Sequence, residues 1–250
     1  MKKTVFLIMT AIFACLNMVM ADTVCSIQGD VIVSSSKYID PFWSDSIPHS
    51  SINYVKKSKI TLDATDGYYD INFYRPANGE EIEEDLATFG DVFFSKMVID
   101  YHAHDLTKTT QTTTLYNDAY WFNIDHWTYN TYTDNPWKLN SDAACRVINL
   151  SSDSFALLLR GQRDSIDPPT VSIFVLHKGQ VKLVYNKDME INDIKQNNSS
   201  TVYELQNIKY DDADNIIPDY YDLIFEKEQI SIVKKTYLRE NISIAILSKN

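Results

Sequence analysis

Hydrophobic and polar residues alternate with a period of two along most of this chain. Successive side chains of a β-strand point to opposite faces, so this period predicts strands with one buried and one solvated face. β-branched and aromatic residues, which favour strands, are frequent in the same segments. The pattern predicts an all-β protein whose strands cover Val24–Val33, Ile52–Leu62, Tyr68–Tyr74, Val92–His102, Thr109–Tyr116, Tyr120–Trp127, Arg146–Leu150, Phe155–Arg160, Val171–His177, Val181–Asn186, Val202–Tyr210, Leu223–Glu226, Ile230–Lys235 and Ile242–Leu247.

Turn-forming residues separate these segments. The clearest hairpin joins Val171–His177 to Gln180–Asn186 through the dipeptide Lys178-Gly179, because glycine adopts the positive φ that tight hairpin turns require. The Asn-, Gln- and Ser-rich segment Asn192–Ser200 is expected to be a loop.

The spacing of the strands indicates the architecture. Arg146–Asn186 holds four consecutive expected strands, which predicts an antiparallel meander, and Val202–Leu247 would form a second, looser one. We expect an antiparallel sandwich or open barrel of about 12–14 short strands. Propeller-like four-stranded meanders are the alternative, although no blade motif recurs at a fixed period.

One short helix is expected, over Glu80–Phe89. Ile82, Leu86 and Phe89 fall on one face of this helix. The glutamates of its first turn suit the positive end of the helix dipole, and Gly90 is a suitable C-terminal stop.

The first 21 residues have the pattern of a secretory signal. Lys2 and Lys3 precede the apolar stretch Val5–Leu16, and Val19–Ala21 has small residues at the two positions that a signal peptidase reads. The apolar stretch is too short for a permanent transmembrane helix. We therefore expect residues 1–21 to be removed and the mature protein to be periplasmic or extracellular, not an integral membrane protein.

The number of cysteines agrees with export to an oxidising compartment. Cys15 would be lost with the signal, leaving Cys25 and Cys145, which we expect to form a disulfide in an oxidising compartment. Two free thiols are the alternative. Ile12–Cys15 also loosely resembles a bacterial lipobox, which would anchor the protein to lipid at Cys15, but the bulky Phe13 favours simple cleavage.

Residues 22–250 are expected to form a single all-β domain. The polar segment Asp134–Asp142 contains Asn135-Pro136, so two β subdomains divided near residue 140 are the alternative.

The composition limits the classes of partner. Hydrophobic residues make up 44% of the chain, which is enough for a folded core. The formal charge of −11 becomes −13 when Lys2 and Lys3 are removed, and so negative a surface repels nucleic acid and anionic membranes. A glycan or a cationic protein is the expected partner.

Two groups of residues suggest metal binding. His102 and His104 are two apart, so on one strand both would reach the same zinc ion, with His126 or Asp105 completing the shell. The acidic segment 211–215, with the aspartates at 219 and 222, suggests calcium, although no EF-hand pattern is present. The simpler interpretations are exposed imidazoles and a solvated acidic turn, so we expect no cofactor, with zinc or calcium as alternatives.

Aromatic residues are concentrated in the middle of the chain. Flat rings interleaved with Asn, Asp and Thr are typical of sugar-binding clefts, because the rings cover the apolar faces of a sugar while polar neighbours bind its hydroxyls. The same residues also fill β-sheet cores. The candidate ligand-binding residues are Trp121, Trp127, Tyr129, Tyr132 and Trp137.

Motifs for serine hydrolases, metalloproteases and nucleotide binding are absent from the sequence. We therefore expect an exported binding protein, in preference to an enzyme, that engages a glycan or a protein partner through its aromatic-rich centre. The alternatives are a zinc-dependent hydrolase that uses His102, His104 and His126, and a structural envelope component without a small-molecule site.

Overall fold

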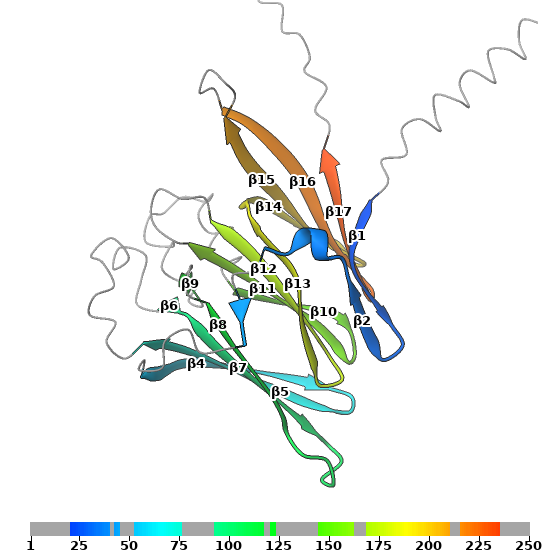
Figure 1. Ribbon diagram of the computed structural model, residues 1–250. Coiled ribbons are helices and arrows are strands. Elements are labelled where there is room, and N and C mark those ends of the chain that lie inside the picture. The colour runs from blue at the N-terminus through cyan, green and yellow to red at the C-terminus, as the bar shows by residue number, and fades with distance from the viewer. Residues whose placement is uncertain are drawn as a thin grey trace, which may run out of the picture.

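The computed structural model describes residues 21–40, 43–45, 53–76, 93–117, 121–123, 145–162, 169–210 and 216–235. The expected helix over Glu80–Phe89 and the expected last strand over Ile242–Leu247 lie outside these ranges. The described residues form three antiparallel sheets and contain no α-helix, which confirms the all-β prediction (Figure 1).

The three sheets are named A, B and C. Sheet A consists, in spatial order, of β14 (Glu190–Gln196), β15 (Thr201–Tyr210), β16 (Ile216–Glu226), β17 (Gln229–Lys235), β1 (Asp22–Gln28) and β2 (Val31–Ser34). Sheet B consists of β13 (Gln180–Asp188), β12 (Thr170–His177), β11 (Ser154–Gln162), β9 (Trp121–Asn123) and β6 (Phe93–Phe94), with β10 (Cys145–Ser151) also paired to β11. Sheet C consists of β3 (Trp43–Ser44), β8 (Gln111–Asn117), β7 (Lys96–Ala103), β5 (Gly67–Pro76) and β4 (Tyr54–Ala64).

Sheet B is the middle layer of a three-layered sandwich (Figure 1). All eight residues of β12 are buried. Along β11, Ala156 and Leu158 contribute to the core shared with sheet A, whereas Leu157 and Leu159 contribute to the core shared with sheet C. A strand covered on both faces needs a continuous apolar run, which explains why these two segments do not alternate in sequence. The layered arrangement is that of a sandwich and not of a propeller, whose blades surround an axis.

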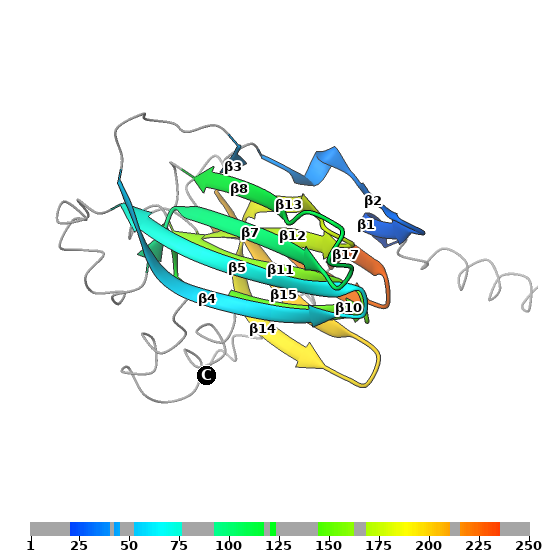
Figure 2. The same ribbon diagram turned by 90° about the horizontal axis from the view of Figure 1, so that it is seen from below.

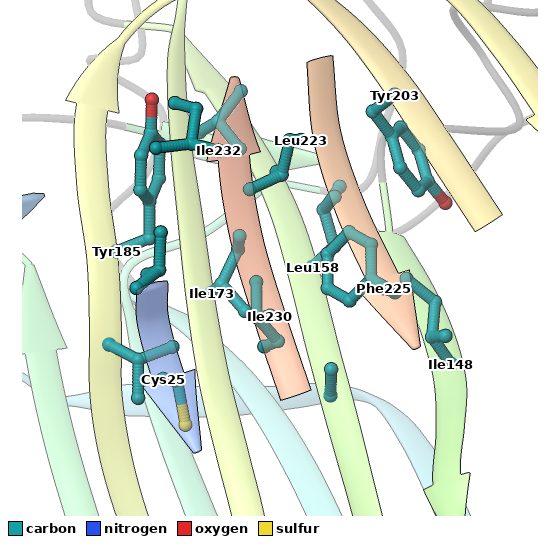
Figure 3. Packing of buried hydrophobic residues seen from close by; sticks show 14 of the residues in the cluster. Cys25, Ile148, Leu158, Ile173, Tyr185, Tyr203, Leu223, Phe225, Ile230 and Ile232 are labelled. Carbon is teal, nitrogen blue, oxygen red and sulfur yellow. The ribbon is translucent and has the colours of Figure 1, made fainter. Parts of the chain in front are cut away.

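The core between sheets A and B is built from side chains of both sheets (Figure 3). Tyr203 and Phe225 make an edge-on ring contact with centroids 5.5 Å apart, and Ile173 of sheet B and Ile230 of sheet A are fully buried. Truncating one such aliphatic side chain to alanine costs about 2–5 kcal/mol. This core therefore holds the two layers together.

The core between sheets B and C fixes which side of sheet C faces solvent. Tyr69, Ile71 and Phe73 of β5 are fully buried against sheet B. The alternate residues of β5 must then point away from sheet B, and the same holds for the neighbouring strand β7, where Met97 and Ile99 are buried.

Several predicted segments differ from the observed strands, among them Leu223–Glu226, which is only the last part of β16. Val24–Val33 is a hairpin of β1 and β2, because Gly29 takes a φ of +64° and reverses the chain. Val92–His102 is divided at Ser95 into β6 and β7. The loop expected over Asn192–Ser200 is wrong for residues 192–196, which belong to β14. The turn follows at Asn197, whose side-chain oxygen accepts backbone hydrogen bonds from Ser199 and Ser200.

The first expected meander is present, as are three strands of the second, whose expected last strand Ile242–Leu247 lies outside the described residues. β10, β11, β12 and β13 pair in sequence order, and the Lys178-Gly179 turn has positive φ at both residues, 46° and 82°. The second meander is formed by β14 to β17 and begins at Glu190, earlier than expected.

Strands from both sides of residue 140 share two of the three sheets. β1 pairs with β17 in sheet A, and β9 pairs with β11 in sheet B. A division near residue 140 would therefore separate hydrogen-bonded strands.

Cys25 is a buried free thiol, so the predicted Cys25–Cys145 disulfide is absent from the structure (Figure 3). A bulge between Thr23 and Cys25 shifts the register of β1, and both Val24 and Cys25 are buried in the core between sheets A and B. The backbone of Cys145 pairs with Leu159, a residue of the other core.

No helix in the described ranges has the length and apolar character needed to cross a membrane.

Candidate ligand-binding face

We call the side of sheet C that points away from sheet B the outer face of sheet C; in Figure 2 the strands β4, β5, β7 and β8 lie in front of the other sheets. The residues of this face are identified from the alternation of side chains along β5 and β7 and from the register of these strands with β4 and β8. Its residues are Tyr54, Lys56, Lys59, Thr61 and Asp63 of β4, Tyr68, Asp70, Asn72 and Tyr74 of β5, Lys96, Val98, Asp100 and His102 of β7, and Thr112, Thr114 and Tyr116 of β8.

Asp70 lies in the polar centre of this face. Its carboxylate accepts a hydrogen bond of 2.8 Å from Thr61 Oγ1 and forms an ion pair of 2.8 Å with Lys59 Nζ. Partial burial raises the pKa of the Asp70 carboxyl, but the hydrogen bonds from Lys59 and Thr61 outweigh this effect and hold the pKa below its ordinary value. Asp70 is therefore a charged, fixed acceptor.

A second carboxylate continues the polar centre. Asp100 accepts a hydrogen bond of 2.6 Å from Thr112 Oγ1, and the Asn72 amide nitrogen lies 3.5 Å from its other oxygen. The side-chain oxygen of Asn72 is buried and has no hydrogen-bond partner, although the residue lies on the outer face and is 7% exposed. Buried polar groups are seldom left unpaired.

His102 stacks on Tyr68 at one end of the face. The two rings are 4.6 Å apart with an interplanar angle of 16°. Thr110 Oγ1 lies 3.2 Å from His102 Nδ1, and Asp70 lies 3.8 Å from His102 Nε2. The two rings therefore cover one face of each other, and the polar edge of the imidazole is already hydrogen-bonded.

The described part of the structure does not place the expected zinc ligands next to one another. β7 ends at Ala103, so His104 lies in the following turn, where the two-residue spacing no longer places it on the same face as His102. His126 lies outside the described residues, and within those residues no three His, Cys, Asp or Glu side chains form a metal-binding group. The zinc site stays a prediction.

Lys96 occupies the opposite end of the face, among three tyrosines from β4, β5 and β8. Its ammonium lies 5.0 Å from the ring centroid of Tyr54, 5.1 Å from that of Tyr74 and 5.5 Å from that of Tyr116. These distances are those of cation–π contacts. We call this group the tyrosine cage.

The two aromatic groups lie far apart along one strand. Tyr68 and Tyr74 are six positions apart on β5, which corresponds to about 20 Å at the rise of a strand. Asp70 and Asn72 lie between them. The outer face of sheet C is thus a polar strip with an aromatic surface at each end.

The aromatic residues expected to bind ligand lie mostly outside the described ranges. Trp121 begins β9, where its backbone pairs with Gln162. Trp127, Tyr129, Tyr132 and Trp137 are not among the described residues, so their role stays a prediction. Sequence analysis did not single out Tyr54, Tyr68, Tyr74 and Lys96. The signal for two of them was the recurrence of tyrosine at even positions of the segment Tyr68–Tyr74.

A separate pocket of about 380 Å³ lies where four hairpin turns of sheets A and B meet. It is lined mainly by Ser151, Asp153, His177, Lys178, Lys227 and Glu228. This lining carries charges of both signs and no Tyr, Trp or Phe ring, so it lacks the tyrosine rings of the outer face.

A chain of hydrogen bonds passes beneath this pocket. Ser151 donates to Ser154 over 2.9 Å, Ser154 donates to His177 Nδ1 over 2.8 Å, and His177 Nε2 donates to the Gly29 carbonyl over 3.0 Å. A carbonyl only accepts, so the imidazole carries its proton on Nε2. Ser154 is fully buried, so the hydroxyl bonded to the imidazole does not reach a ligand. The chain thus joins the turns and does not supply a nucleophile.

The described aspartates of the expected calcium site are paired with lysines. Asp219 lies 2.9 Å from Lys234 Nζ, and Asp222 lies 2.8 Å from Lys235 Nζ. Residues 211–215 lie outside the described ranges, and the calcium site stays a prediction.

Comparisons of this chain with protein-family models, with curated proteins and with solved structures found no match.

Proposed function

We propose that this protein is a glycan-binding protein and that its binding site is the outer face of sheet C. The observation that carries the proposal is the arrangement of one polar strip between two aromatic surfaces about 20 Å apart. This spacing suits an extended oligosaccharide better than a single small molecule.

The chemistry of the two parts is complementary to a glycan. Tyr68 with His102, and the tyrosine cage around Lys96, offer ring surfaces to the apolar faces of sugar rings. Asp70 and Asp100 offer acceptors between them to sugar hydroxyls, and Lys59 offers a donor.

An open face sets an upper limit on affinity, because it covers only one side of the ligand. We expect dissociation constants between about 10 μM and 1 mM, which correspond to about 4–7 kcal/mol of binding free energy. Binding of this strength is useful when several sites act together.

We also propose that the protein acts outside the cytoplasm. The signal-like residues 1–21 support this location, and extracellular or periplasmic glycans are then accessible.

A glycan array followed by isothermal titration calorimetry tests the proposal. We expect the wild-type protein to bind at least one oligosaccharide of the array, and the Tyr74→Ala variant to bind it at least tenfold more weakly. Tyr220→Ala is the matched control, because Tyr220 lies in β16 of sheet A, and it should leave the affinity unchanged. Absence of binding to every array member, or equal weakening by the two variants, would refute the proposal.

A cationic protein is the second candidate partner. The formal charge of −11 favours it, since opposite charges accelerate association. A partner captured from envelope extract at low salt and released at high salt would support this function, whereas capture that does not respond to salt would contradict it.

A further inference from the structure

Lys96 is held differently from Lys59, Lys187 and Lys235, which form ion pairs with carboxylates. Lys59 is paired with Asp70, Lys187 with Asp40 and Lys235 with Asp222. No carboxylate of the described residues pairs with Lys96, although the chain has 34 acidic and 23 basic residues. Its positive charge is therefore not neutralised by an ion pair within the described part of the chain.

The tyrosine cage holds the Lys96 ammonium through ring contacts, and the N–H groups of the ammonium donate to no oxygen of the described residues. Tyr54, Tyr74 and Tyr116 come from β4, β5 and β8, and β7, which carries Lys96, lies between β5 and β8 in the sheet. Cation–π contacts act on the charge through the ring faces and leave N–H groups free to donate. The lysine is thus partly preorganised, and less side-chain freedom is lost when an anion binds to it.

A second unmet group lies beside the cage. Asn72 precedes Tyr74 by two residues on the same strand, and its carbonyl oxygen is buried without a donor. This oxygen is enclosed, so a ligand on the surface of the sheet does not reach it. Lys96, which has no carboxylate partner among the described residues, is the group that a ligand with a carboxylate would satisfy.

We infer that the ligand of the outer face is an acidic glycan, and that Lys96 binds the carboxylate of a uronic or similar sugar acid. The inference rests on the proposed function and names the class of its ligand. The carboxylate accepts a charge-assisted hydrogen bond from Lys96 Nζ, while the rings of Tyr54 and Tyr74 contact the sugar to which it is attached.

Two features make Lys96 a determinant of specificity as well as of affinity. A net charge of −11 disfavours an acidic ligand over most of the molecule. The acidic ligand then binds only where a positive charge is fixed, as at Lys96. Asp70 and Asp100 repel a second carboxylate of the ligand that lies near them on the strip.

The test compares one acidic oligosaccharide, an oligouronide, with its carboxyl-reduced form, which has the same rings and hydroxyls but no charge. Titration calorimetry is carried out with the wild-type protein and with Lys96→Gln and Lys96→Arg. We expect the wild type to bind the acidic form at least tenfold more tightly than the reduced form. Lys96→Gln should bind the two forms within about twofold of each other, and Lys96→Arg should keep a preference for the acidic form.

The outcomes separate this inference from the proposed function. Equal affinity of the wild type for the two forms, or an unchanged preference in Lys96→Gln, would overturn the inference and leave glycan binding in place. Binding of neither form, together with a negative glycan array, would overturn both. The ligand pair tests the wild type directly, so the result does not depend on the folding of a variant, which circular dichroism checks independently.

Discussion

Ser154 and His177 are register partners on β11 and β12, and the serine hydroxyl donates to His177 Nδ1 over 2.8 Å. The other nitrogen of the same imidazole donates to the carbonyl of Gly29, in the turn between β1 and β2. One buried side chain therefore connects the middle layer of the sandwich to the N-terminal hairpin of sheet A. Lys178 and Gln180 add contacts to Asp30 in the same turn.

We expect His177→Ala to destabilise the protein by about 2–4 kcal/mol, because it leaves a buried hydroxyl and a carbonyl without partners and removes packing. Urea unfolding followed by circular dichroism measures the change. His104→Ala, in an exposed turn beyond β7, is the matched control and should change stability by less than about 0.5 kcal/mol. Equal midpoints for the two variants would show that the connection contributes nothing.

Gly179 and Gly29 provide a second matched pair. Both have positive φ, +82° and +64°. A Cβ on Gly179 would lie 2.5 Å from the Gln111 side-chain oxygen and 2.8 Å from the Tyr101 ring, whereas a Cβ on Gly29 would meet no atom within 4 Å. We expect Gly29→Ala to cost about 1 kcal/mol, the backbone strain alone. Gly179→Ala should cost about 1–3 kcal/mol more, because crowding is added to the strain. Thermal and urea unfolding measure the difference, and a smaller effect at Gly179 than at Gly29 would contradict it.

The pH dependence of stability reports on Asp70. Its pKa is lower in the folded protein than its ordinary value of 3.8, so the folded state favours the charged carboxylate. The resulting stabilisation is fully present above pH 3.8 and is lost as the pH falls below that value through the folded pKa. We expect Asp70→Asn to lose about 1 kcal/mol at pH 7 and to show a weaker decline below pH 4 than the wild type.

Unfolding curves between pH 2.5 and 7 measure this difference, because the interval includes the ordinary carboxyl pKa. Thr61→Val removes one donor and leaves Lys59, so it should reproduce only part of the effect. Parallel profiles for the wild type and Asp70→Asn would contradict the assignment.

The burial of Cys25 predicts low thiol reactivity. Burial raises the pKa of its thiol to about 11, so very little thiolate is present at pH 8. In a Cys145→Ser variant that starts at Asp22, we expect iodoacetamide to modify Cys25 only after denaturation, as measured by intact mass. Rapid labelling of the native protein would contradict the burial. A mass two hydrogens lower in the unsubstituted protein would show that the cysteines pair after all.

Local sequence patterns were sufficient to predict strands and turns that depend on neighbouring residues alone. The turn at Lys178-Gly179 and the four strands around it were predictable, because glycine conformation and apolar runs act between neighbours in sequence. β14 was missed because its segment is polar. It is an edge strand of sheet A, and its pairing with β15 stabilises it more than its own side chains do.

The candidate site was less predictable than the strands, for a definite reason. β5 has aromatic residues on both faces, with Tyr69 and Phe73 buried and Tyr68 and Tyr74 facing outward. The alternation with a period of two places these two pairs on opposite faces of the strand. It does not predict which of the two faces is buried. Only the packing of sheet C on sheet B decided that.

The sequence by itself determined the all-β class, the positions of most strands and the acidic character of the surface, because each depends on composition or on residues close together in the chain. The three-layered stacking, the free state of Cys25 and the tyrosine cage were decided by the tertiary structure. The cage assembles Tyr54, Tyr74, Lys96 and Tyr116 from four strands whose order in the sheet, β8, β7, β5 and β4, is set by non-local hydrogen bonding. No local rule specifies that order, since it depends on which strand edges meet once the layers have formed.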